Sequence, residues 1–201
     1  MHLDGDLEAM NDTDWRERIA KLVRIPQIIV AALVAGCVFF LVVVLLVPGG
    51  PGPAAGGDAA RPQPVLTWIG LVFVATIAIV RAVVPTVMVR NGRRRIAQGT
   101  FQPPQARVKS HQKAQQQLEE MGDAGQLFGL YLIKTIIGAA LPEGATFLML
   151  IAFMTERQTL ALGVAVALIL AVAAHLPTRT GVIHWIEDQL RLVEAERSLE
   201  R

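Results

Sequence analysis

The chain has 201 residues, of which 53% are hydrophobic and 18% are charged. Soluble domains carry about 25% charged residues, so this composition excludes an ordinary soluble globular domain. The net charge of +2 is too small to indicate a polyanionic partner such as nucleic acid. A single cysteine, Cys37, excludes an internal disulfide.

Cys37 ends the run Val-Ala-Gly-Cys, which matches the short motif that precedes the lipid-modified cysteine of bacterial lipoproteins. The polar region before the first apolar segment is about 27 residues long, which is long for a signal peptide. Membrane-type sequence also continues after the cysteine, over residues 38–47. We therefore interpret Cys37 as part of a transmembrane helix and keep the lipoprotein as the alternative.

Four segments are apolar enough to cross a bilayer as helices. A helix needs about 20 mostly apolar residues to cross ~30 Å of hydrocarbon, because lipid offers its backbone groups no other partner. The segments are residues 28–47, 65–89, 127–154 and 160–176, and the last, with 17 residues, is at the lower limit. The sequence predicts an all-α integral membrane four-helix bundle over residues 28–176, flanked by an N-terminal segment 1–27 and an amphipathic helix in 177–201.

Lys and Arg residues are distributed unevenly among the connecting segments. Fifteen lie before the first span, between the second and third spans, or after the fourth, whereas the other two connections hold only Arg61 and Arg157. Cytoplasmic loops carry the excess of Lys and Arg. We expect a multi-pass protein of the cell (inner) membrane with both termini in the cytoplasm. The Pro- and Gly-rich outer loop 48–64 is typical of a flexible linker.

Three segments outside the spans are predicted to be helical. Asp12 or Thr13 is a suitable cap for a short helix over residues 12–24, which Pro26 is expected to end before the membrane. The polar stretch 106–121 is expected to lead through Gly122 and Gly125 into the third span. Residues 177–201 carry apolar side chains at helical spacing, expected to pack on the cytoplasmic end of the bundle or on a second copy: Ile183, Ile186, Leu190 and Val193.

Three ionisable residues interrupt the second and third spans, and each costs roughly 3 kcal/mol or more at mid-bilayer. Glu143 lies nine residues from Lys134, about 13 Å at 1.5 Å per residue, and Arg81 lies nine residues from Arg90. This common depth predicts an Arg81–Glu143 pair in which each charge offsets the desolvation of the other. Lys134 lies on the opposite face of its helix from Glu143. In the alternative to the pair, Lys134 and Arg81 snorkel toward the cytoplasmic interface on their long side chains. Pro142 predicts a kink beside Glu143.

These charges allow two interpretations. In the first, a buried pair fixes how the second and third spans pack, or a protonated Glu143 lies in lipid. In the second, Glu143, Arg81 and Lys134 form a proton- or cation-binding site.

The run Gly-Ala-Ala-Leu-Pro-Glu-Gly over residues 138–144, followed by Ile-Ala-Phe at 151–153, resembles the carboxylate-bearing helix of subunit c of rotary ATP synthases. In that family a mid-membrane Glu or Asp among small residues carries the transported ion, so the resemblance implies this role for Glu143. It covers 16 of 201 residues. Subunit c is a two-helix hairpin with a glycine repeat that spans one and two lack, and the whole chain more closely resembles small bacterial multi-pass membrane proteins.

Small residues recur at every fourth position in two spans, a pattern that allows helices to approach closely. They are Ala140 and Gly144 in the third span, and Gly163, Ala167 and Ala171 in the fourth. The pattern leaves open whether the partner helix belongs to the same chain, a second copy or another membrane protein.

No pattern indicates an enzyme, a metal site or a cofactor. His184 and Asp188 are spaced for one helix face, but two ligands do not make a metal site. The only serines, Ser110 and Ser198, lie outside the spans, and no Gly-rich phosphate loop is present. We therefore expect a structural or accessory membrane protein, with an ion pathway centred on Glu143 and Arg81 as the alternative.

Overall fold

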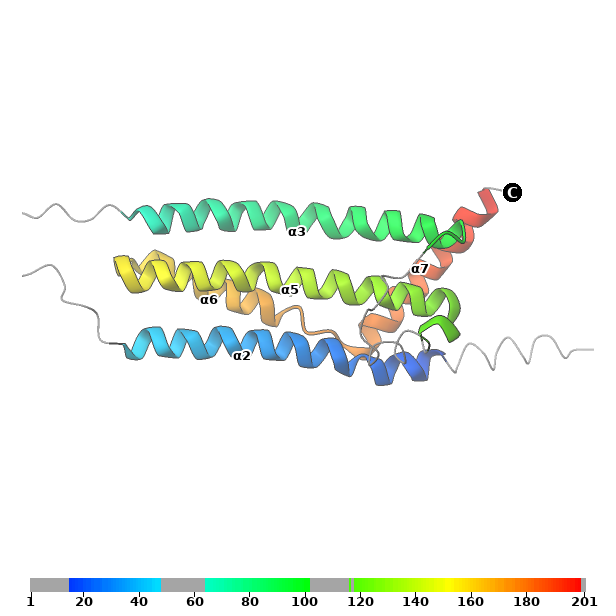
Figure 1. Cartoon of the computed structure of the whole chain (residues 1–201), viewed down its shortest axis with the longest axis horizontal. Coiled ribbons are helices and arrows are strands. Elements are labelled where there is room, and N and C mark those ends of the chain that lie inside the picture. Colours follow the sequence, from blue (N-terminus) through cyan, green and yellow to red (C-terminus); the bar gives the residue numbers. More distant parts are fainter. Residues whose placement is uncertain (1–14, 48–63, 102–115, 117, 200–201) are drawn as a thin grey trace, which may run out of the picture. The chain divides into compact units, whose positions relative to one another are not determined.

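The computed structural model describes residues 15–47, 64–101, 116 and 118–199. Within these residues the chain is helical and contains no β-strand, which confirms the predicted all-α class. The helices are α2 (Arg24–Leu46), α3 (Val65–Ala97), α5 (Gly122–Glu156), α6 (Thr159–Ala173) and α7 (Arg179–Leu199) (Figure 1). The predicted caps Asp12 and Thr13, nearly all of loop 48–64 and most of the polar stretch 106–121 lie outside the described residues.

Three helices contain the first three predicted spans. The helix that includes α2 covers 32 residues from Trp15 to Leu46, α3 has 33 residues and α5 has 35. At 1.5 Å per residue, 33 residues extend about 50 Å, well beyond ~30 Å of hydrocarbon. The described part of the chain thus has three helices long and apolar enough to cross a membrane.

The fourth apolar helix, α6, has 15 residues, none of them charged. The sequence predicts a span over residues 160–176, but the helix ends at Ala173, and His175 and Leu176 follow it in a turn and an irregular segment. A helix of this length covers about 22 Å.

The helices contain Pro26, Pro85 and Pro142. Of these, Pro26 is predicted from the sequence to end the N-terminal helix. The helical residues 15–22 end at a turn at Val23, close to the predicted stop, and Pro26 lies in the first turn of α2, where the missing N–H has little cost. Pro85 and Pro142 lie inside α3 and α5, which continue through them. The real ends are at glycines with positive φ: Gly99 follows α3 with φ 66°, and Gly122 begins α5 with φ 57°.

The chain divides into two compact units, and α2, α3 and α5 each run from one into the other. The first unit comprises the described residues of Met1–Ile28, Val84–Ile136 and Pro177–Arg201. Its core includes Phe128 of α5 and Ile186 of α7. Of the predicted amphipathic face of α7, Ile186 and Val193 are buried and Ile183 and Leu190 are partly buried against this core, so that face packs within the chain.

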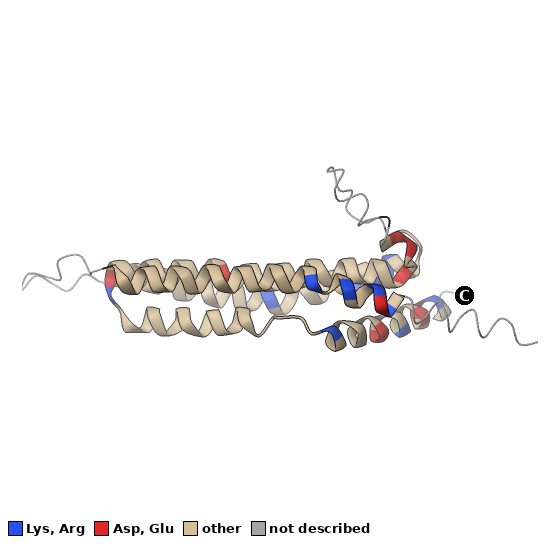
Figure 2. Cartoon of the chain, turned by 90° about the horizontal axis from the view of Figure 1, so that it is seen from below, with Lys and Arg blue, Asp and Glu red and all other residues tan. Residues whose placement is uncertain are grey.

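The second unit comprises the described residues of Ile29–Val83 and Ile137–Leu176. Its apolar contacts form two clusters, one around Met149 and Ala165 and one around Val30, Ala139 and Val172. Charged residues are sparse along its helices and absent from α6, whereas α7 carries both signs along its length (Figure 2).

Candidate functional site

Arg81 meets a histidine that follows α6. The guanidinium nitrogen Nη2 of half-buried Arg81 lies 3.5 Å from Nδ1 of His175. A Cβ atom added at Gly138 of α5 would lie 3.3 Å from Cδ2 of the same ring, so glycine lets the imidazole approach α5 closely. The second unit thus brings together Arg81, Gly138 and His175 from three parts of the chain, which we call the Arg81–His175 site.

The contact of His175 with a backbone carbonyl determines whether its ring can accept a hydrogen bond from Arg81. Nδ1 lies 2.8 Å from the carbonyl oxygen of Ala171, and a carbonyl only accepts, so Nδ1 carries a proton and donates it. A guanidinium also only donates. The contact of Arg81 with Nδ1 therefore joins two donors and is not a hydrogen bond, and His175 does not neutralise the arginine charge.

Two prolines deprive backbone carbonyls of this site of their helical hydrogen-bond donors. Pro85 has no N–H for the carbonyl of Arg81, and Pro142 has none for the carbonyl of Gly138, each four residues earlier in its helix. In an apolar environment such carbonyls need donors from side chains, water or a cation. The Arg81–His175 site therefore combines a positive charge, an imidazole and two carbonyls that accept no i+4 helical hydrogen bond.

Glu143 lies beside α2. It interacts electrostatically with the buried thiol of Cys37, which also forms a hydrogen bond with Thr146. The Thr146 hydroxyl donates its proton to the carbonyl of Pro142 at 2.8 Å. Among the described residues, no ion pair or hydrogen bond joins Glu143 to Arg81, so the structure does not form the predicted pair.

Lys134 belongs to the first unit, where it lies over an aromatic ring. Its Nζ atom is 5.2 Å from the ring centroid of Trp185 on α7, and Tyr131 packs on the same ring with centroids 5.3 Å apart. A cation–π contact of this kind is worth about 0.5–2 kcal/mol. The contacts described for the three predicted site residues are thus different: Arg81 lies by His175, Glu143 interacts with Cys37 and Lys134 lies over Trp185.

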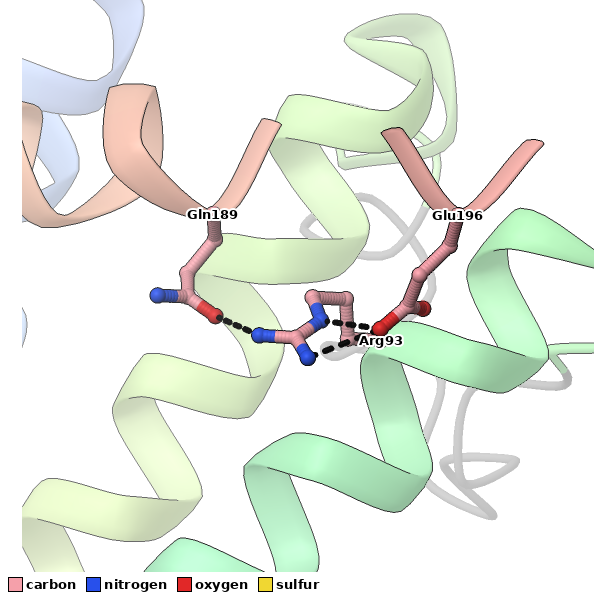
Figure 3. A network of polar contacts seen from close by, with 3 residues as sticks. All are labelled: Arg93, Gln189 and Glu196. Carbon is pink, nitrogen blue, oxygen red and sulfur yellow. Dashed lines mark hydrogen bonds and ion pairs between the residues drawn. The ribbon is translucent and has the colours of Figure 1, made fainter. Parts of the chain in front are cut away.

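Charged contacts in the first unit join α7 to α3. Arg93 of α3 reaches Glu196 with Nε and Nη2, at 2.9 and 2.7 Å from the same carboxylate oxygen, and Nη1 donates to Gln189 at 3.4 Å (Figure 3). The other oxygen of Glu196 is buried and has no hydrogen-bond partner among the described residues. These contacts join α7 to α3.

Arg197 of α7 links two further helix ends. Its Nε and Nη2 atoms each donate at 3.3 Å, to the carbonyls of Ala97 and Ile96 at the end of α3. Its Nη1 lies 2.8 Å from Asp123 in the first turn of α5. A cation at a helix C-terminus and an anion at a helix N-terminus both match the helix dipole.

Glu156 makes polar contacts that the sequence pattern does not predict. Its carboxylate accepts hydrogen bonds from the amides of Leu66 and Thr67, at 2.5 and 2.9 Å, and from the Thr67 hydroxyl at 2.6 Å. Glu156 lies beyond the apolar segment 127–154. Desolvation raises its pKa, but the hydrogen bonds from Thr67 and Leu66 outweigh this effect and lower the pKa below its usual value. Two features of the sequence could have indicated this contact. One is an acidic residue just after the third apolar segment, and the other is the run Pro–Val–Leu–Thr at the start of the second.

No cluster of three or more His, Cys, Asp or Glu residues suited to a metal occurs among the described residues. Nδ1 of exposed His184 lies 3.6 Å from the half-buried Glu187 on α7. Compared with known proteins, the chain matches no protein family, no curated protein and no solved structure.

Proposed function

We propose that this chain is a multi-pass membrane protein with a structural or accessory role, exercised through helix contacts with another chain in the bilayer. In this proposal α6 is a fourth pass, both termini face the cytoplasm, and the membrane is the inner one. The Lys and Arg distribution supports the orientation. The irregular residues after α6 extend its reach, and His175 within them contacts protein, as non-helical backbone at membrane depth requires.

The observation that carries the proposal is that small-residue positions of two helices remain uncovered. Gly163 and Ala167 of α6 are exposed, and so are Ala140 and Gly144 of α5. A Cβ atom added at Gly163 or Gly144 would meet nothing within 4 Å. Small residues at this spacing let a neighbouring helix approach closely, and no helix of the described chain occupies that space. A helix of a second copy or of a partner membrane protein fits there.

The proposal is tested by enlarging one small residue. Gly163→Leu starts its side chain in open space, since an added Cβ atom meets nothing within 4 Å, and blocks close approach of another helix. We expect it to reduce self-association, measured by energy transfer between labelled chains in liposomes, or co-purification of a partner from native membranes. Val166→Leu is the matched control, because Val166 is exposed on the same helix outside the small-residue pattern. Equal association of both variants and the parent, or a parent without any associated chain, contradicts the proposal.

The second candidate function is a proton or cation pathway that includes Glu143 and Arg81. It is favoured by the state of Glu143, whose carboxylate has no ion-pair or hydrogen-bond partner among the described residues although it lies inside an apolar helix. The resemblance of this helix to that of subunit c indicates the same residue. Ion flux into liposomes that contain the parent protein or Glu143→Gln tests the pathway. Absence of flux in the parent, or equal flux in both proteins, eliminates it.

A further inference from the structure

A basic hollow lies on the first unit between the N-terminal helix and the start of α7. Its volume is about 500 Å³, and it is lined by Glu17, Ala20, Lys21, Arg24 and Arg179. Ala20, with its single methyl group, leaves the space that the longer side chains surround. Three cations and one carboxylate give the lining a formal charge of +2.

The three cations of the hollow differ from the arginines of the same unit that are already paired with a carboxylate. Four of those arginines form ion pairs: Arg16 with Glu187, Arg18 with Glu120, Arg93 with Glu196, and Arg197 with Asp123. Lys21, Arg24 and Arg179 are exposed, and no carboxylate of the described residues pairs with them. They remain available to a ligand from outside the chain.

The backbone around the hollow is held in place and adds positive potential. The side chain of Gln27 donates to the carbonyl of Pro177 at 2.9 Å, which ties the start of α2 to the segment before α7. The Thr178 hydroxyl accepts from the amide of Gly181 at 3.2 Å and caps α7. Arg179 is the first residue of α7, so the positive end of this helix dipole lies beside the three cations.

The sequence positions of the lining residues correspond to the headgroup level of a bilayer. Arg24 and Lys21 precede the apolar segment 28–47 by four and seven residues, about 6 and 10 Å at 1.5 Å per residue. Arg179 follows the apolar segment 160–176 by three residues. The polar region of one leaflet is about 5–8 Å thick, so all three cations fall at or near its depth.

We propose that this hollow binds the phosphate of an anionic phospholipid headgroup, held by Lys21, Arg24 and Arg179. This inference rests on the proposed membrane placement of the chain but not on its proposed contacts with other chains. The guanidinium groups offer paired donors to phosphate oxygens, and the ammonium of Lys21 acts as a point charge. The carboxylate of Glu17 in the lining repels anions and disfavours a more highly charged free anion.

Native mass spectrometry of the full chain, released from nanodiscs of phosphatidylcholine with phosphatidylglycerol, tests the site. We expect the parent to retain phosphatidylglycerol in preference to phosphatidylcholine. Each Lys or Arg near the surface contributes about fivefold to such binding, so the triple change K21Q/R24Q/R179Q is expected to lower retention about a hundredfold. Ala20→Leu fills the hollow without changing any charge and is expected to lower retention as well.

The matched control is R94Q/R95Q/R191Q, which removes the same charge from exposed residues outside the hollow. Equal loss in both triple variants shows a general charge effect and overturns the site, as does retention of both lipids alike. Displacement of lipid by millimolar inorganic phosphate identifies free phosphate as the ligand and overturns the lipid source. If alkaline extraction removes the parent from membranes, the membrane placement fails and the site with it. A parent that resists extraction but shows no preference overturns the site alone.

Discussion

Glu156, the last residue of α5, accepts two hydrogen bonds from Thr67 in the first turn of α3, one from the amide and one from the hydroxyl. The first amides of a helix have no partner inside it, and a negative charge beside them matches the helix dipole. Glu156 therefore acts as the N-cap of α3, although its partner Thr67 lies 89 residues earlier in the chain. The contact fixes one end of α3 against α5 within the second unit.

Replacement of Glu156 by Gln is expected to destabilise the protein by about 1 kcal/mol, as the loss of a helix N-cap does. Gln keeps one acceptor oxygen but loses the charge and one acceptor. The measurement is thermal unfolding in detergent at neutral pH. The control adds Gln158→Glu to Glu156→Gln, which places a carboxylate two residues further on. This second change should not restore the stability lost in Glu156→Gln. A variant as stable as the parent would show that the cap contributes nothing.

The difference in stability between the parent and Glu156→Gln should depend on pH, and the lowered pKa of Glu156 gives the direction. Because folding lowers the pKa of Glu156, its stabilising contribution is present above the ordinary pKa of about 4.5 and is lost as the pH falls through the lower folded value. The difference in melting temperature between the parent and Glu156→Gln should be largest near neutral pH and should close below pH 4.5. A difference that widens on acidification contradicts the assignment.

Arg197 is expected to be the most important single charged residue of α7. Replacement by Ala removes the contacts to the end of α3 and to Asp123 together, and should cost about 1–3 kcal/mol because the carbonyls and the carboxylate lose a charged donor. Arg191→Ala is the matched control, since Arg191 is exposed on the same helix and has no ion pair among the described residues. Chemical unfolding of both variants measures the difference. Equal effects would show that Arg197 acts only through helix propensity.

The apolar helices could be predicted from the sequence because their length and composition are local properties. The first three spans lie almost wholly within α2, α3 and α5, and the face of α7 that packs on the core was evident from its spacing. Helix ends were less predictable. Pro26 was expected to end the N-terminal helix, and a turn at Val23 does separate that helix from α2. The chain resumes as helix at Arg24, because a proline in the first turn loses no hydrogen bond.

The site was less predictable than the fold. Counting residues along each helix placed Arg81 and Glu143 at one depth, but depth does not determine the direction in which a side chain points. In the structure Arg81 points toward His175, whereas Glu143 lies by Cys37. Which helices are neighbours depends on packing between distant segments, which a single sequence does not show. The contact between Glu156 and Thr67 was missed for the same reason.

This arrangement makes Arg81→Met a sharp test. Breaking a buried ion pair costs about 3–5 kcal/mol, whereas removing an unpaired charge from an apolar helix is neutral or stabilising. We expect Arg81→Met to unfold at the same or a higher temperature than the parent. The effects of Arg81→Met and Glu143→Gln should add within about 0.5 kcal/mol in a double-mutant cycle. A coupling energy of several kcal/mol would establish the ion pair that the structure lacks.

Gly125 is expected to tolerate no side chain. A Cβ atom at this position of α5 would overlap the backbone carbonyl of Leu118, which cannot move as a side-chain tip can. Gly125→Ala should therefore destabilise the protein by about 1–3 kcal/mol. Gly129→Ala, one helical turn later, would meet nothing within 4 Å and should be neutral or stabilising by up to about 1 kcal/mol. Thermal unfolding that ranks the two variants in the opposite order contradicts this account.

Cys37 provides a test of the packing around Glu143. The thiol is fully buried and is the only one in the chain, so the folded protein should resist N-ethylmaleimide and become labelled only on unfolding. Thr155→Cys in a Cys37→Ala background is the control, because residue 155 is exposed at the end of α5 and should react at once. The intact mass of the parent should show no attached acyl chain, since a lipid on Cys37 would have to displace the packed groups of α5. Rapid labelling of the folded parent, or a mass increase equal to a lipid, would show that α2 does not pack through Cys37.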